Sequence, residues 1–197
     1  DLSAVYLDIL KDRLYTFRKD SPLRRGSQTV LFDILVALTK LMAPVLSFTA
    51  EEIWRMLPES VRADSKADSV HLAMFPEVDP RWADAKLAQR WERLLDVRMK
   101  IQSALEWRRR DKVIGSSLEA KVVIGAVEDV YKELEGADLT GLCIVSEVIL
   151  NRVEEIPKEG HLLCDTAGLW IDVEKATSAK CERCWNYRAA VGSFPDH

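Results

Sequence analysis

The stretch from Gln28 to Leu57 constrains the fold most, because it joins a long apolar helical repeat to a proline stop. Large apolar side chains recur at helical spacing over most of the circumference, which is typical of a helix buried by several neighbours. Pro44 has no backbone N–H and disfavours α geometry at Ala43, so the helix is expected to end near Met42. The apolar positions are Val30, Leu31, Ile34, Leu35, Ala37, Leu38, Leu41 and Met42.

A second helix is expected directly after Pro44. Thr49 and Glu52 have the spacing of a capping box, and Phe48 and Ile53 stand at the two positions of a hydrophobic staple. The pattern predicts a rigid helix, a sharp corner and a firmly capped second helix. Such an element is architectural and has no chemistry of its own.

The residues around this corner resemble a known family. LMAPVLSFTAEEIW, Leu41 to Trp54, is similar to the helix–corner–helix of the anticodon-binding domain in class I aminoacyl-tRNA synthetases for isoleucine, valine, leucine and methionine. YLDILKDRLYTF, near the start of the chain, resembles the opening helix of the isoleucine-type domain. The resemblance implies a helical bundle that packs against the anticodon stem of a tRNA. The corner alone does not separate the four amino-acid specificities.

Composition narrows the class of protein. With 48% hydrophobic and 30% charged residues, the chain is expected to be a soluble globular protein. No apolar run reaches the roughly 20 residues that span a bilayer, so no membrane partner is expected. The net charge of −4 hides an asymmetry, since residues 81–112 carry ten basic and five acidic groups and residues 113–175 carry five and thirteen. This pattern favours one face turned toward an anion and another kept away from it.

The periodicities predict a mainly α chain with three parts. Residues 1–112 are expected to be all-helical and 113–176 a small α+β junction module. The resemblance implies that 1–112 is the helical anticodon-binding domain, and that 177–197 is a truncated zinc-knuckle tail on residues given below. Ser3 is the expected N-cap of the first helix, residues 18–27 a turn-rich basic loop and residues 58–69 a polar connection without periodicity. Asp1 stands inside a helical pattern and no closing element precedes His197, so both ends are expected to be cuts in a longer protein.

The longest helix is expected from Ala83 to about Arg110, before the periodicity changes at Lys112. Alternation then predicts a strand near residues 118–124, a short acidic helix at Glu128 to Leu134, a strand within residues 142–153 and a hairpin turning at residues 166–168. The buried stripe of the long helix is expected to be Leu87, Trp91, Leu94, Leu95, Ile101 and Leu105.

Basic residues beside the predicted bundle are candidate RNA contacts. Several cations on one loop add up through counterion release, although a solvated loop is the alternative for each of them. Trp107 with the arginines after it suits base stacking and phosphate contact, or else Trp107 is core and the arginines neutralise the helix C-terminus. The candidates are Arg18, Lys19, Arg24, Arg25, Arg90, Arg93, Trp107, Arg108 and Arg109.

Cys181 and Cys184 are candidate metal ligands, because two thiolates three positions apart fit a tight turn around one tetrahedral zinc. Lys180, Arg183 and Arg188 could offset thiolate charge and point toward phosphate. A redox pair has the same spacing, but no βαβ pattern follows it. Cys143 and Cys164 are expected to be buried free thiols, and His71 is assigned no function.

KCERCWNY, with a later Val-Gly and a His, resembles the carboxy-terminal zinc knuckle of bacterial isoleucine–tRNA ligases. In that family a second Cys-x-x-Cys follows, so this chain is expected to hold half a site, with zinc weak or absent and His197 a poor substitute ligand. The resemblance implies a cytoplasmic, monomeric enzyme that joins isoleucine to tRNA(Ile) with ATP and Mg²⁺. Those are expected to bind elsewhere in the synthetase chain, because no HIGH-like, KMSKS-like or other catalytic motif occurs here. The expected partners are tRNA(Ile) and the rest of the synthetase, with no DNA.

Three alternatives stay open. The first is the same region of a valine–tRNA ligase, in which a long heptad arm would follow the tail. The second is a helical protein-interaction domain with a zinc-ribbon tail and no RNA role. The third is a dithiol oxidoreductase, for which the Cys181 thiol would need a strongly depressed pKa.

Overall fold

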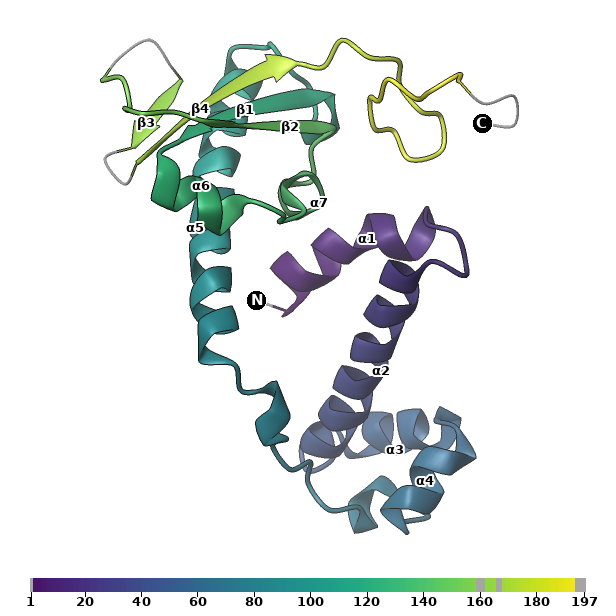
Figure 1. Ribbon diagram of the computed structural model, residues 1–197. Helices are drawn as coiled ribbons and strands as arrows, with labels where there is room; N and C mark the ends of the chain where they lie inside the picture. Colours follow the sequence, from purple (N-terminus) through teal and green to yellow (C-terminus); the bar gives the residue numbers. More distant parts are fainter. Residues whose placement is uncertain (1, 159–161, 166–167, 194–197) are drawn as a thin grey trace. The chain divides into compact units, whose positions relative to one another are not determined.

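A computed structural model describes residues 2–158, 162–165 and 168–193 (Figure 1). The chain divides into two compact units, one of Arg13–Ala83 and one that combines Asp1–Asp12 with Asp84–His197. We call them the corner unit and the sheet unit. Among the described residues, no helix combines the length and apolarity that crossing a membrane requires.

The corner unit contains four helical segments and two short turns of 3₁₀ helix. The first segment is the end of α1 (Asp8–Tyr15), which continues a π-helical stretch, Leu2–Leu7, of the other unit. Ser3 therefore lies inside a helix and is not its N-cap, which corrects the sequence prediction. The remaining elements are α2 (Pro22–Met42), α3 (Ser47–Met56), α4 (Glu59–Ser65), η2 (Val70–Leu72) and η3 (Pro80–Trp82).

The helix end before Pro44 is confirmed, with a different local cause. Ala43 keeps right-handed helical geometry, with φ −52° and ψ −39°, so the stop comes from the missing N–H of Pro44 rather than from a change at Ala43. The N–H groups of Val45 and Leu46 both donate to the Met42 carbonyl, at 2.9 and 2.8 Å. The chain reverses within these residues and α3 starts at once.

The capping box and the hydrophobic staple are wrong. The corner is so tight that α3 begins at Ser47, which places Thr49 inside the first turn instead of at the N-cap. No side chain caps this helix end, and Phe48 is 94% exposed and does not pack on Ile53. The sequence spacing was correct for a capping box, but the N-cap is Leu46, three residues before the Thr49 that the motif needs.

All-round burial of α2 is also wrong within the corner unit. α2 packs on α3 and η2 along one side only, where Val36 and Ala43 join the core. The buried side chains of the helix are Ser27 and Thr39, and the Thr39 hydroxyl donates to the Leu35 carbonyl at 2.7 Å. Four of the apolar positions that the repeat assigned to the interior are exposed, namely Val30, Leu35, Leu38 and Leu41.

Two segments predicted as irregular are helical. Pro22 is the first residue of α2 and Gly26 lies within it, because proline is well tolerated in the first helical turn. Arg24 and Arg25 consequently stand on a helix and not on a loop. The polar connection at residues 58–69 contains α4, which Lys66 ends with a left-handed φ of 50°.

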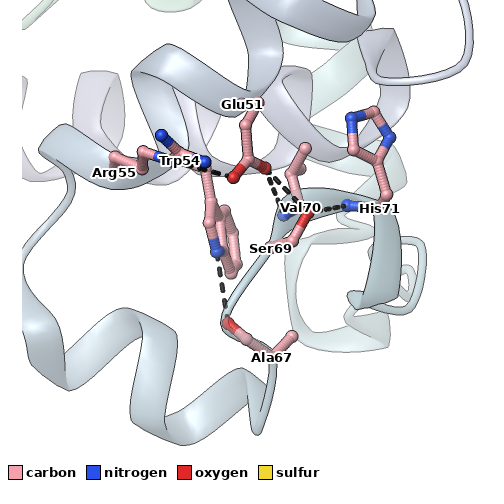
Figure 2. Close-up of polar contacts among 7 residues, drawn as sticks. All are labelled: Glu51, Trp54, Arg55, Ala67, Ser69, Val70 and His71. Carbon is pink, nitrogen blue, oxygen red and sulfur yellow. Dashed lines mark hydrogen bonds and ion pairs between the residues drawn. The ribbon is translucent and has the colours of Figure 1, made fainter.

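A small core around Trp54 holds the corner unit together, and Figure 2 shows its polar frame. The fully buried indole donates to the Ala67 carbonyl at 3.2 Å. The Glu51 carboxylate accepts hydrogen bonds from the Ser69 hydroxyl at 2.8 Å and the Val70 N–H at 3.1 Å. Together these bonds fix the segment before η2 against α3. The other buried core residues are Ala43, Ala50, Leu57, Ala67 and Val70.

The sheet unit is built on α5 (Ala85–Arg110), which the sequence predicts to within two residues. The Asp84 side chain caps its start by accepting from the Leu87 N–H at 3.0 Å. The predicted stripe is right at Leu94, Ile101 and Leu105, whereas Leu95 is half-buried. It is wrong at Leu87 and Trp91, which are 50% and 45% exposed. The buried face of α5 consists of Leu94, Val97, Arg98, Ile101, Ala104 and Leu105.

Four strands form one mixed sheet in the order β2-β1-β4-β3. β1 (Ala120–Ala126) pairs in parallel with β2 (Glu147–Arg152), and α6 (Glu128–Leu134) and α7 (Leu139–Cys143) make the connection between them. β4 (Leu169–Lys175) runs antiparallel to β1 and to β3 (Leu163–Asp165). The predicted acidic helix and the predicted hairpin are confirmed. Residues 166–167, in the predicted turn of the hairpin, lie outside the residues that the structure describes. The first strand starts two residues later than the predicted 118–124, since η4 (Ser117–Glu119) comes before it, and β2 lies within the predicted residues 142–153.

The helix α5 and the sheet share one core, although the sequence analysis assigned them to separate domains. Ile101 and Leu105 of α5 belong to the same buried cluster as Val122, Ile124 and Ile171 of β1 and β4. On the other side of β1, the Trp170 ring lies so close over Gly125 that a Cβ atom there would meet it at 2.1 Å. The core therefore lies on one face of β1, and on the opposite face the Trp170 ring covers Gly125.

Candidate nucleic-acid interface

The start of α2 gathers four of the predicted cations in the corner unit. Arg18 pairs with Asp20 at 3.1 Å while its side chain remains 85% exposed. Lys19 is exposed, and Arg25 lies against the neutral amide of Gln28 at 3.5 Å. Arg24 is different, since it is half-buried and its guanidinium donates to the Phe17 carbonyl at 2.8 Å. Three cations thus face solvent, and Arg24 braces the turn that presents them.

The middle of α5 carries Arg90 and Arg93, and both reach toward α6. The Arg90 guanidinium donates to the backbone carbonyl of Glu135 at 3.1 Å. Arg93 approaches the Glu133 carboxylate at 3.7 Å, with its side chain 56% exposed. These two arginines hold α6 and its acidic end against α5, so only part of their charge is directed to solvent.

The end of α5 carries Trp107, Arg108 and Arg109. Arg108 is half-buried and its Nε donates to the Val173 carbonyl of β4 at 2.9 Å. Arg109 pairs with Glu106 and also donates to the Ser117 hydroxyl at 3.1 Å. Trp107 is 40% exposed, so it is neither a fully buried core residue nor a fully exposed ring for base stacking. A groove of about 570 Å³ opens beside Arg109.

The structure therefore does not bring all nine predicted contacts together within one unit. Arg93 and Arg108 are fifteen residues apart on one helix, which separates them by roughly 22 Å along its axis. The remaining four, Arg18, Lys19, Arg24 and Arg25, belong to the corner unit. Arg24, Arg90 and Arg108 donate to backbone carbonyls, which gives each of them a structural task.

Arg98 is a cation with a structural role that the sequence pattern did not reveal. It is only 6% exposed, and its Nε donates to the Leu142 carbonyl at 2.9 Å, near the C-terminus of α7. A guanidinium there satisfies a carbonyl that the short helix leaves open. Nothing in the spacing of α5 separates Arg98 from its exposed neighbours, because its partner lies 44 residues further along the chain.

The tail folds Cys181 and Cys184 into one tight turn. The Cys181 N–H donates to the Asn186 carbonyl and the Trp185 N–H to the Cys181 carbonyl, both at 2.9 Å. The pKa of the Cys181 thiol is lowered, because backbone N–H groups of Cys184 and Arg183 bond its sulfur and the Cys184 thiol adds a further hydrogen bond. The turn suits thiolate ligation of zinc. Within the described part of the chain, no group of three or more metal-binding side chains is present.

Trp185 is a candidate contact that the sequence analysis missed. It follows Cys184 directly, has a left-handed φ of 62° and is 62% exposed. Lys180 Nζ lies 5.7 Å from the centroid of its ring. An exposed aromatic face next to a cation is suited to stack on an unpaired base. The sequence did contain a signal for this contact, because a tryptophan directly follows the Cys-x-x-Cys pair and Lys180, Arg183 and Arg188 lie nearby in the chain.

A single hydroxyl anchors this turn to the sheet. The buried Ser146 side chain donates to the Leu118 carbonyl and accepts from the Tyr187 N–H, the latter at 2.6 Å. Tyr187 in turn forms an isolated β-bridge with Lys180, the residue before Cys181. The thiolate turn is therefore fastened to the start of β2.

Cys143 is the other cysteine whose side chain the structure describes. Cys143 is buried in α7, and burial raises the pKa of its thiol to about 12, as expected for a buried free thiol. Cys164 is part of β3, but its side chain lies outside the described residues, as does His197. His71 is exposed at η2, and its backbone N–H donates to the Ser69 hydroxyl at 3.3 Å.

Comparison with known proteins identifies the class first. The family described as the anticodon-binding domain of tRNA ligase matches residues 1–124, which defines this region as an anticodon-binding domain. Isoleucine–tRNA ligases match the whole chain: 43% identity over 198 residues in Thermoanaerobacter sp. strain X514, 44% over 199 in Geobacter sulfurreducens and 45% over 205 in Desulfitobacterium hafniense strain DCB-2. The chain belongs to the family of anticodon-binding domains of tRNA ligases, and over its whole length it is similar to isoleucine–tRNA ligases. It spans 21% of the length of these relatives.

Proposed function

We propose that this chain is the region of an isoleucine–tRNA ligase that holds the anticodon stem-loop of tRNA(Ile). The supporting observation is the exposed cationic turn at the start of α2, inside the residues that match the anticodon-binding family. Arg18 and Lys19 present positive charge on the turn before α2, Arg25 adds a cation in the first turns of α2, and Arg24 braces the junction from within. Cations held on a rigid turn attract phosphate through counterion release with little ordering cost.

On this proposal, some of the predicted contact residues position other elements and others contact RNA. Arg24, Arg90 and Arg108 mainly position other elements, since each donates to a backbone carbonyl. Trp185 supplies a stacking surface for an unpaired base, with Lys180 beside it for a phosphate. Contact with RNA then falls to the exposed turn and to the tail.

The full enzyme on this proposal is a monomer that joins isoleucine to its tRNA with ATP and Mg²⁺, using parts of the polypeptide other than these residues. Cys181 and Cys184 supply two thiolates of a zinc site, and two further ligands complete it in the whole synthetase. This chain by itself holds zinc weakly. The named relatives are isoleucine enzymes, so the valine alternative has no support among them.

The test replaces Lys19 and Arg25 by Glu in a full-length synthetase that contains this chain. Loss of two phosphate-binding cations and gain of two anions should raise the KM for tRNA at least tenfold and flatten its dependence on salt. Isoleucine-dependent ATP–pyrophosphate exchange should stay within twofold of the unmodified enzyme, because that step uses no tRNA.

The matched control keeps both charges, with Lys19→Arg and Arg25→Lys, and should leave the KM for tRNA nearly unchanged. Two results would contradict the proposal. One is an unchanged KM in the charge-reversed enzyme, which would favour a protein-interaction domain. The other is pyrophosphate exchange that falls in parallel with aminoacylation.

A further inference from the structure

The segment from Leu72 to Trp82 of the corner unit exposes an unusual amount of apolar surface. We call residues 72–82 the apolar segment. It runs from Leu72, the last residue of η2, to Trp82, the last residue of η3. Its large side chains are Leu72, Met74, Phe75, Val78 and Trp82, with exposed fractions of 73, 82, 59, 90 and 73%. Single exposed apolar residues are ordinary, but five within eleven positions form a candidate contact surface.

The apolar segment is held in shape at both ends. At its start, the Glu51 carboxylate binds the Ser69 hydroxyl and the Val70 N–H, and the Ser69 hydroxyl accepts from the His71 N–H (Figure 2). At its end, the Asp79 carboxylate caps η3 by accepting from the Arg81 N–H at 2.9 Å. Pro76 and Pro80 restrict the backbone between them. A surface ordered in advance loses little conformational freedom when a partner binds.

The charges of the apolar segment do not suit RNA. Nε and Nη2 of Arg81 both donate to the Asp79 Oδ2 atom, at 2.9 and 2.6 Å. This hydrogen bonding lowers the pKa of Asp79 and raises that of Arg81. The pair neutralises itself, which leaves Glu77 as the uncompensated formal charge of the segment. A phosphate backbone would therefore meet apolar side chains and an acid, and would gain no free cation. An apolar protein face is the complementary partner.

We propose that the apolar segment docks on an apolar face of the remaining polypeptide of the same synthetase. The relatives are about five times longer than this chain, so most of their surface lies outside it. A permanent partner within one polypeptide explains an apolar surface that would otherwise favour aggregation. The inference rests on membership of the synthetase family and not on tRNA contact, so it stands or fails separately from the proposed function.

Hydrogen exchange without tRNA tests the docking directly. The amides of residues 72–82 should exchange at least tenfold more slowly in a full-length synthetase than in the 197-residue chain. The amides of β1 should exchange equally in both, as the internal control. Equal rates at the apolar segment would overturn the proposal. So would protection already present in the 197-residue chain, or protection that appears only when tRNA is added.

A variant test uses Met74→Lys with Val78→Lys. Both side chains are at least 82% exposed, so the Tm of the 197-residue chain should not change. The Tm of the full-length synthetase should fall by several degrees, because two charges are forced into an apolar contact. Met99→Lys on α5, with a side chain that is 59% exposed, is the matched control and should leave both Tm values unchanged. An unchanged Tm of the double variant in the full-length enzyme, or an equal fall in both proteins, contradicts the docking.

Discussion

The two compact units handle their apolar residues in different ways. Among its described residues, the sheet unit buries eighteen in one cluster that joins α5, α7 and the sheet. The corner unit buries Trp54 and five residues around it, while one side of α2 and the apolar segment remain exposed. Helical periodicity is at least as strong in the corner unit. The difference shows that an apolar repeat identifies the face that a helix can bury. It does not show whether other elements of the same unit pack on that face.

The largest expected effect comes from removing the centre of the smaller core. Trp54→Ala should cost about 3–5 kcal/mol, because it opens a large cavity and leaves the Ala67 carbonyl without its donor. Hydrogen exchange should show the corner unit opening while β1 stays protected. Trp82→Ala, with a side chain 73% exposed, should change the stability of the 197-residue chain by less than about 0.5 kcal/mol. Simultaneous loss of both units would show that they are one cooperative body.

Replacing one glycine in each unit by alanine should change the stability of the two units in opposite directions. Gly125→Ala in the sheet unit should cost about 1–3 kcal/mol, since its Cβ would meet the Trp170 ring at 2.1 Å. Gly26→Ala in α2 should stabilise by about 1 kcal/mol, because nothing lies within 4 Å and alanine favours helix. Urea unfolding monitored separately for each unit would measure both changes. A neutral Gly125→Ala would show that the ring moves aside freely.

The smallest effect is a pH dependence confined to the corner unit. The Ser69 hydroxyl, the Val70 N–H and Arg55 lower the pKa of Glu51 below 4.5 in the folded state. A depressed carboxylate pKa stabilises the fold above pH 4.5, and this stability is lost as the pH falls through the folded value. Glu51→Gln should therefore lower the Tm of the corner unit at pH 7, and the difference should shrink below pH 4.5. A difference that is constant with pH would mean that the charge of Glu51 is not involved.

Much of the secondary structure was readable from the sequence, and the errors have local causes. α5, α6 and the end of α2 follow from periodicity and from Pro44. The start of α2 was missed because Pro22 and Gly26 are signals for a turn as well as for a helix start. The first turn of α3 was displaced because the distance from Pro44 to the helix is set by hydrogen bonds to the Met42 carbonyl, which no pattern records.

The candidate interface was less predictable than the fold. Sequence identifies Arg24, Arg90 and Arg108 as cations, but their carbonyl partners lie 7, 45 and 65 residues away and decide that each positions a neighbouring element. Cys181 and Cys184 were readable as a pair of thiols because both fall within one turn. Trp185 was overlooked because only the folded turn shows that its ring faces solvent.

The bond from the Tyr187 amide to Ser146 has a consequence for how the tail meets a metal ion. The loop around Cys181 is joined to the start of β2 through Tyr187, by contacts that use neither cysteine sulfur. On the proposed zinc site, metal binding would leave this attachment intact, and its free energy would go into gathering the further ligands. On that proposal, a chelator should loosen the metal-binding part of the tail while the attachment of Tyr187 to the sheet persists.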